Sequence, residues 1–103
     1  MMDQGNIDSI VCVDFKYPIV IRTKINVIEE RYLTEFKSQL FVSGSGNFGE
    51  LKDTVEFFCP PELEFLIHDK EVKVGDNVEI RFYGNVRKEE RFVKQFNLIK
   101  LGD

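Results

Sequence analysis

Residues 72–101 read VKVGDNVEIRFYGNVRKEERFVKQFNLIKL, and this stretch decides the fold. Val78, Ile80 and Phe82 are apolar at every second position, which is the side-chain period of a strand with one buried face. The Gly-Asp pair at 75–76 favours a tight turn just before them, because glycine accepts a positive φ and aspartate hydrogen-bonds to its own backbone. The pattern therefore predicts a strand that starts at a tight turn.

The partner of this strand follows directly in the sequence. Residues 92–101 form a second apolar-rich run that contains no glycine or proline. Between the two runs lie the charged residues 87–91, RKEER, which suit a solvated loop. The stretch as a whole is therefore predicted to be a long β-hairpin.

The composition is that of one folded domain. The chain has 103 residues, of which 43% are hydrophobic and 13% aromatic, and this is enough for a single core. We assign residues 10–103 to the domain and the polar, acidic residues 1–9 to a flexible leader that is no signal peptide. The net charge of −4 argues against binding of duplex nucleic acid through bulk charge, but it leaves room for a local basic patch.

Cysteine usage and hydropathy exclude further classes of protein. Cys12 and Cys59 are too few and too far apart for a zinc site or a disulfide scaffold. We expect both to be reduced and buried, with no metal or other cofactor. No apolar run reaches the length of a membrane-spanning helix, so no membrane segment is expected. The expected location is the cytoplasm of a bacterium or of a phage-infected cell.

Four more strands are predicted before the hairpin, at residues 10–15, 19–29, 36–43 and 53–59. Pro18 separates the first two, because proline lacks the N–H that a central strand needs. The faces expected to be buried carry Ile19, Ile21, Thr23, Ile25 and Val27 in the second strand, Phe36, Ser38, Leu40 and Val42 in the third, and Val55, Phe57 and Cys59 in the fourth.

Two links and one helix connect these strands. Residues 30–34, ERYLT, are expected to form a short polar link, and residues 44–49, GSGNFG, a flexible hairpin loop. The prolines at 60–61 end the last of these strands and open a helix over residues 62–70, since proline is tolerated in the first helical turn. The apolar stripe of this helix consists of Leu63, Leu66 and Ile67.

The order of these elements is that of an OB-fold, a small Greek-key barrel of five strands with one helix between the third and the fourth. The strand at 10–15 is extra. The sequence from Ile21 to Leu101 resembles the small single-domain OB-fold proteins of the single-stranded-DNA-binding type found in bacteria and phages. The resemblance rests on the long first strand, the glycine-rich link, the proline-started helix and the turn Val74-Gly75-Asp76-x-Val78. It implies an all-β protein that binds single-stranded DNA, or RNA, in replication.

Catalysis has little support in the sequence. The one histidine, His68, lies on the predicted helix beside Ile67 and Asp69, and no serine or cysteine occupies a recognisable nucleophile motif. The histidine, cysteine and carboxylate residues show no metal-ligand spacing. We therefore expect a binding protein and not an enzyme.

The strand faces that point away from the core carry groups suited to single-strand binding. Basic groups can follow a phosphate backbone, and aromatic rings can stack on bases. Phe41 and Phe58 fall on neighbouring strands of this outer face; the alternatives are packing under the helix, under the N-terminal strand or in a dimer interface. Glu56 and Glu79 oppose phosphate binding there. The outward residues assigned to the site are Arg22, Lys24, Lys37, Gln39, Phe41, Phe58, Arg81 and Tyr83.

Two loops complete the predicted site. Phe48, at the tip of the glycine-rich loop, is placed either to close over a bound strand or to be a simple solvent-exposed tip. Arg87 and Lys94, in and beyond the charged loop, are placed to contact phosphates. Glu89 and Glu90 in the same loop favour plain solvation instead.

The leading hypothesis is a non-enzymatic module that binds single-stranded nucleic acid with low sequence specificity. The alternative is a protein–protein interaction module or a structural subunit, which would use the same aromatic face for a replication or assembly partner. The extra strand at 10–15 is expected either to fold back on its own barrel or to pair with another copy. Of these two we prefer the closed homodimer.

Overall fold

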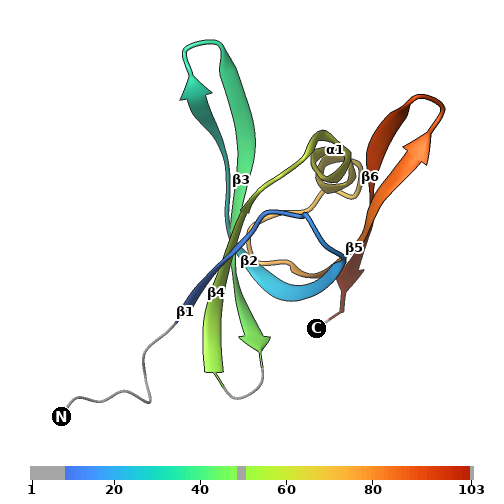
Figure 1. Ribbon diagram of the computed structural model, residues 1–103. Coiled ribbons are helices and arrows are strands. Elements are labelled where there is room, and N and C mark those ends of the chain that lie inside the picture. The colour runs from blue at the N-terminus through green and yellow to red at the C-terminus, as the bar shows by residue number, and fades with distance from the viewer. Residues whose placement is uncertain (1–8, 49–50, 103) are drawn as a thin grey trace.

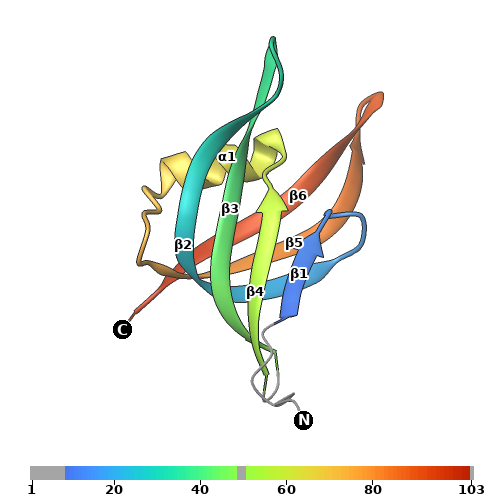
Figure 2. The ribbon, with the colours of Figure 1, turned by 90° about the vertical axis from the view of Figure 1, so that its left-hand side faces the viewer.

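Six strands and one helix build the structure, a computed structural model that describes residues 9–48 and 51–102. The strands form one sheet in the order β1-β4-β3-β2-β5-β6, which curls into a half-barrel (Figure 1, Figure 2). The predicted fold class, all-β with one short helix, is confirmed. Of the predicted leader, residues 1–8 lie outside the described residues and Ser9 belongs to the first strand. The elements are β1 (Ser9–Val13), β2 (Ile19–Thr34), β3 (Lys37–Phe48), β4 (Leu51–Phe58), α1 (Pro61–Asp69), β5 (Asn77–Lys88) and β6 (Arg91–Leu101).

The long strand β2 joins the two halves of the sheet. Residues 19–24 of β2 pair antiparallel with β5, and residues 23–34 pair antiparallel with β3. The strands β2, β3 and β4 follow one another as a meander, and α1 then leads to the predicted hairpin of β5 and β6. Strands β2 to β6 thus have the order expected of an OB-fold-like Greek key, and β1 is added beside β4.

An irregularity in β2 changes which side chains face the core. Ile21 and Ile25 are buried as predicted, but the register with β3 shifts between Ile25 and Val27. One extra residue inverts a period-2 alternation, so Ile28, and not Val27, packs against the core. Phe36 also departs from the predicted face, because it lies in the turn between β2 and β3 and is 92% exposed.

Two segments that were expected to be loops belong to strands. Residues 30–34 extend β2, and residues 44–48 extend β3, where they pair with β4. A side chain at position 44 would clash with β2, because a Cβ there would lie 2.8 Å from the carbonyl oxygen of Lys24. The glycine therefore allows two strands to approach each other and does not form a flexible loop.

Two hairpins project from the half-barrel, with α1 between them (Figure 1). We call residues 27–41 of β2 and β3 the β2–β3 arm, and residues 84–95 of β5 and β6 the β5–β6 arm. The loop predicted at residues 87–91 is shorter than expected, because β5 ends at Lys88 and β6 begins at Arg91. The basic residues at these two positions are therefore held on paired strands.

The helix α1 begins where two consecutive prolines end β4. Pro61 lies in its first turn, where the missing N–H has no helical partner to lose, and Leu63 and Ile67 bury one face against the sheet. After the helix, Gly75 takes a φ of 99° and Asp76 Oδ2 accepts a hydrogen bond of 2.8 Å from a backbone N–H three residues earlier. The predicted Gly-Asp turn is confirmed.

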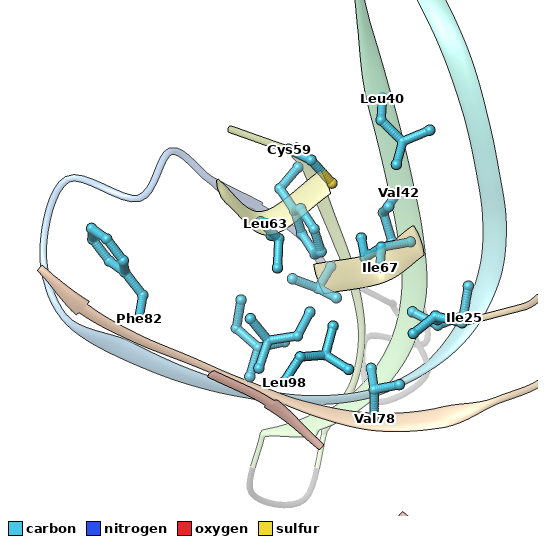
Figure 3. Close-up of a cluster of buried hydrophobic side chains, with 14 of the residues drawn as sticks. Ile25, Leu40, Val42, Cys59, Leu63, Ile67, Val78, Phe82 and Leu98 are labelled. Carbon is cyan, nitrogen blue, oxygen red and sulfur yellow. The ribbon is translucent and has the colours of Figure 1, made fainter. Parts of the chain in front are cut away.

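Phe15 lies where the half-barrel is not closed by strand pairing. This residue follows β1, takes a φ of 53° and is only 1% exposed. Its ring makes edge-to-face contacts with Phe57 of β4, Phe82 of β5 and Phe96 of β6, at centroid distances of 5.2, 5.6 and 5.1 Å. The remaining core lies between α1 and the sheet (Figure 3). Phe15 therefore connects β4 with the β5–β6 hairpin, to which β4 does not hydrogen-bond within the described chain.

The N-terminal strand folds back on its own chain, which is one of the two predicted alternatives. β1 pairs parallel with β4 from Ser9 opposite Asp53 to Val13 opposite Phe57. The homodimer remains a prediction. It assumes that the N-terminal strand lacks a partner within its own chain, whereas β4 is such a partner. Cys59 is buried as expected, whereas the expectation of a buried Cys12 is wrong, because this residue lies exposed on an edge strand.

We expect Phe15→Ala to lower the free energy of unfolding by about 3–5 kcal/mol, through lost transfer energy and the cavity that remains. Urea unfolding followed by circular dichroism measures this change. The matched control is Phe36→Ala, which removes the same ring from an exposed turn and should cost less than about 0.5 kcal/mol. Equal effects of the two substitutions would contradict the central position of Phe15.

The two cysteines should differ in reactivity. Burial, assisted by the nearby Glu64 carboxylate, raises the pKa of the Cys59 thiol to about 12, and the thiol form is a poor nucleophile. A thiol-reactive disulfide reagent at neutral pH should therefore modify Cys12 in the folded protein and both cysteines after unfolding in urea. Rapid modification of Cys59 in the folded state would show that its burial is incomplete.

Candidate nucleic-acid interface

The predicted site residues fall into separate groups along the strands. Phe48 ends β3 opposite Leu51, and its side chain lies outside the part of the chain that the structure describes. The other residues occupy three regions: Arg22, Lys24, Arg81 and Tyr83 on β2 and β5; Lys37, Gln39, Phe41 and Phe58 on β3 and β4; and Arg87 and Lys94 on the β5–β6 arm.

The first group is organised around a carboxylate. Glu79 is 4% exposed and accepts hydrogen bonds from Arg81 Nε at 2.6 Å and from Arg22 Nε at 2.7 Å. These bonds, that of Arg81 first, hold the pKa of the Glu79 carboxyl below its ordinary value, and the same contact raises the pKa of Arg81. Two of the predicted phosphate-binding arginines are thus already paired within the protein.

Phe41, for which the sequence left both stacking and packing open, is buried. The ring is 6% exposed, because the Arg31 guanidinium carbon lies 3.6 Å from its centroid and Phe58 packs against it at 5.3 Å. Arg31 is itself held by Glu29, whose Oε2 accepts a hydrogen bond of 2.6 Å from Nε. A base cannot stack on Phe41 unless this cover moves.

Phe58 keeps a ring surface available to a ligand. Its side chain is 37% exposed and lines a basin of about 440 Å³ together with Gln39 and Lys94. Gln39 Nε2 donates a hydrogen bond of 3.0 Å to the Cys59 carbonyl oxygen, which fixes the amide. The structure therefore brings together three predicted residues from β3, β4 and β6.

Lys94 is anchored at the rim of this basin. Its Nζ donates hydrogen bonds to the Phe15 carbonyl oxygen at 2.9 Å and to Asn85 Oδ1 at 3.3 Å. An ammonium group has three donors, so one remains for a ligand. The Asp14 carboxylate also lines the basin and partly offsets the positive charge of Lys94.

A larger groove of about 650 Å³ adjoins the basin and shares Pro61 and Lys94 with it. It runs between α1 and the β5–β6 arm. Phe65 of α1 and Phe92 of β6 line it and are 66% and 70% exposed. Lys88 contributes a further positive charge, and Arg91 lines the groove as well.

The sequence interpretation did not assign Phe65, Phe92, Lys88 or Arg91 to a site. The two basic residues belong to the charged segment 87–91, for which the sequence favours a solvated loop over phosphate contact. One signal was present for Phe65: it falls outside the apolar stripe of Leu63, Leu66 and Ile67, so it points away from the face that packs on the core. The groove itself depends on how α1 lies beside β6, which no local pattern indicates.

The remaining predicted residues are surface groups. Lys24, Lys37 and Arg87 are exposed, and so is half of Tyr83. His68 Nε2 lies 3.8 Å from Glu64 Oε2 on the exposed side of α1. Residues 9–48 and 51–102 contain no cluster of three or more histidine, cysteine or carboxylate side chains that could hold a metal. Within the same ranges, no helix has the length and hydropathy needed to cross a membrane.

Comparison of the chain with models of protein families, with curated proteins and with solved structures finds no match. The geometry of the basin and the groove is therefore the basis for the function proposed below.

Replacement of Glu79 by glutamine should lower the melting temperature at pH 7, because the two arginines lose their charged acceptor. A carboxyl whose pKa is lowered by folding stabilises the protein above its unfolded pKa of about 4.3 and loses this effect as the pH falls further. The difference in melting temperature between the natural protein and Glu79→Gln should therefore shrink below about pH 4. Scanning calorimetry at several pH values measures it, and a constant difference would contradict the proposed pairing.

Proposed function

We propose that the protein is a non-enzymatic module that binds single-stranded DNA, or RNA, at the basin beside Phe58. The observation that carries the proposal is the partly exposed Phe58 ring beside the Lys94 ammonium group and the Gln39 amide. Proteins that hold single strands without sequence preference combine aromatic stacking surfaces with cations near the backbone. The basin offers one stacking surface, one cation and one polar group for the edge of a base.

The arrangement behind the ring supports stacking. Phe41 contacts Phe58 edge-on, and Phe41 is itself covered by the Arg31 guanidinium group. A ring that is held in one orientation loses little conformational entropy when a base stacks on it. Gln39 uses Nε2 for the Cys59 carbonyl oxygen, which leaves its own amide oxygen as an acceptor for an exocyclic amino group.

The distribution of charge supports a path for the phosphates along the β5–β6 arm. The arm contains four basic residues and two acidic ones, Glu89 and Glu90. Its net charge is therefore +2, in a chain of net charge −4. Binding that depends on phosphate neutralisation by these four residues should be weak and should fall as the salt concentration rises. The basic residues of the arm are Arg87, Lys88, Arg91 and Lys94.

The sequence resemblance extends the proposal to a role in the replication of a phage, a plasmid or a bacterium. A second candidate function, docking to a protein of a larger assembly, is favoured by one separate observation. The tip of the β2–β3 arm exposes Tyr32, Leu33 and Phe36, of which Phe36 is 92% exposed. Oligonucleotide binding does not require this tip, so the two functions can be separated by substitution at Phe36.

Phe58→Ala should weaken binding of labelled oligo-dT by about 5- to 150-fold, which is the value of one base–aromatic stack. Fluorescence polarisation at about 20 mM salt measures the affinity, because low salt favours phosphate contacts. Phe65→Ala is the matched control: it removes an exposed ring outside the basin and should leave the affinity unchanged. Absence of oligo-dT binding by the natural protein at tens of micromolar would refute the proposed function.

A further inference from the structure

Among residues 9–48 and 51–102, the strand β6 forms one edge of the sheet and pairs only with β5. The backbone N–H of Lys94 points away from β5, since it donates a hydrogen bond of 3.1 Å to Glu62 Oε2 on α1. Backbone groups of alternate residues in a strand point to the same side. The outer edge of β6 therefore also presents the N–H and C=O groups of Phe92 and Phe96.

The groove between this edge and α1 has the dimensions of a ligand site. Its volume of about 650 Å³ lies within the range of about 300–1,000 Å³ that is usual for binding pockets. Leu66 and Val93 add apolar surface to the exposed rings of Phe65 and Phe92. An exposed apolar surface rimmed by charged groups is typical of an interaction site.

The charges around the groove favour an acidic ligand. Its lining contains three basic residues, Lys88, Arg91 and Lys94, and one acidic residue, Glu62. This surplus stands out in a chain whose net charge is −4. A strand edge matches the backbone spacing of a polypeptide, and addition of an extended peptide to a free edge is a common mode of recognition. A polypeptide can pair with both the N–H and the C=O groups of such an edge at strand spacing, whereas a nucleic-acid backbone offers phosphate acceptors but no matching donors.

We propose that the groove between α1 and β6 binds an extended acidic segment of a partner protein, which adds to the sheet as a strand beside β6. The apolar side chains of the segment pack on Phe65 and Phe92, and its carboxylates lie near Lys88 and Arg91. This site goes beyond the proposed nucleic-acid function. Its aromatic surface differs from that of the basin, with which the groove shares Pro61 and Lys94. Lys88 and Arg91 also belong to the phosphate path proposed above, so the two ligands would compete for these charges.

Glu62 occupies the position that a backbone carbonyl of the incoming segment would take. Its carboxylate satisfies the Lys94 N–H in the free protein, and it is the one anion among the charged groups of the groove that the structure describes. Binding of the segment exchanges this hydrogen bond for one to the peptide backbone. Removal of the carboxylate should therefore strengthen binding, because it removes both a competitor and a repulsive charge.

The probe for this proposal is a fluorescein-labelled peptide of about nine residues, a usual strand length, that alternates aspartate with valine and phenylalanine. Fluorescence polarisation with the full chain should give a dissociation constant in the micromolar range. Replacement of every aspartate by lysine should weaken binding by about tenfold or more. Methylation of alternate backbone nitrogens, which removes the edge-pairing donors, should weaken it by about tenfold as well.

The protein variants locate the site. Phe65→Ser and Phe92→Ser should each weaken binding of the acidic probe by about tenfold, and Glu62→Ala should tighten it several-fold. Phe36→Ser, in the β2–β3 arm, is the matched control and should have no effect. These side chains are mostly exposed or lie at the rim of the groove, so circular dichroism should report an unchanged fold for every variant.

Several outcomes would overturn the proposal. The proposal is wrong if the acidic probe does not bind at about 1 mM, or if the probe binds equally well after backbone methylation. The proposal is also wrong if Phe65→Ser abolishes binding of oligo-dT and leaves the peptide affinity unchanged, because the groove would then be a nucleic-acid site. Loss of oligo-dT binding in Phe58→Ala together with unchanged peptide binding would support both proposals, so failure of one can be told from failure of the other.

Discussion

The packing of Phe15 against three other phenylalanines holds the two halves of the sheet together. The half-barrel is open between its two edge strands, β1 and β6, and the ring of Phe15 fills this side with contacts to β4, β5 and β6. A phenylalanine with positive φ is strained, and the burial of its whole ring offsets that strain. The Lys94 ammonium group adds a hydrogen bond to the Phe15 carbonyl oxygen. The two ligand sites proposed above both include Lys94, so they are built on this junction.

The distribution of charge explains why these sites surround α1 and do not cover the middle of the strands. On β2 and β5 the two arginines are both paired with Glu79, and on β3 the ring of Phe41 is covered by Arg31. Unpaired positive charge remains on the β5–β6 arm, which projects beyond the core beside the helix (Figure 1). The same extension of β5 and β6 past the core leaves the outer edge of β6 free.

Local patterns predicted most of the fold and part of the site. The period-2 alternation, the double proline and the Gly-Asp turn indicated the strands, the helix and the hairpin, because these signals act over a few residues. The errors depend on contacts between distant residues: the bulge that exchanges Val27 for Ile28, the close approach of Gly44 to β2, and the cover that Arg31 forms over Phe41. Phe58, Gln39 and Lys94 were identified from parity and type. The groove was missed because the position of α1 beside β6 is a property of the tertiary structure.

The position of Phe15 also has a consequence for the order in which the chain folds. Its partners lie on β4, β5 and β6, so its contacts span nearly the whole sequence, and such long-range contacts slow folding because large loops must close first. During synthesis Phe15 emerges 81 residues before Phe96. Until then the meander of β2, β3 and β4 exposes an apolar face without its aromatic cover, and that interval is when the chain is most prone to associate with other chains.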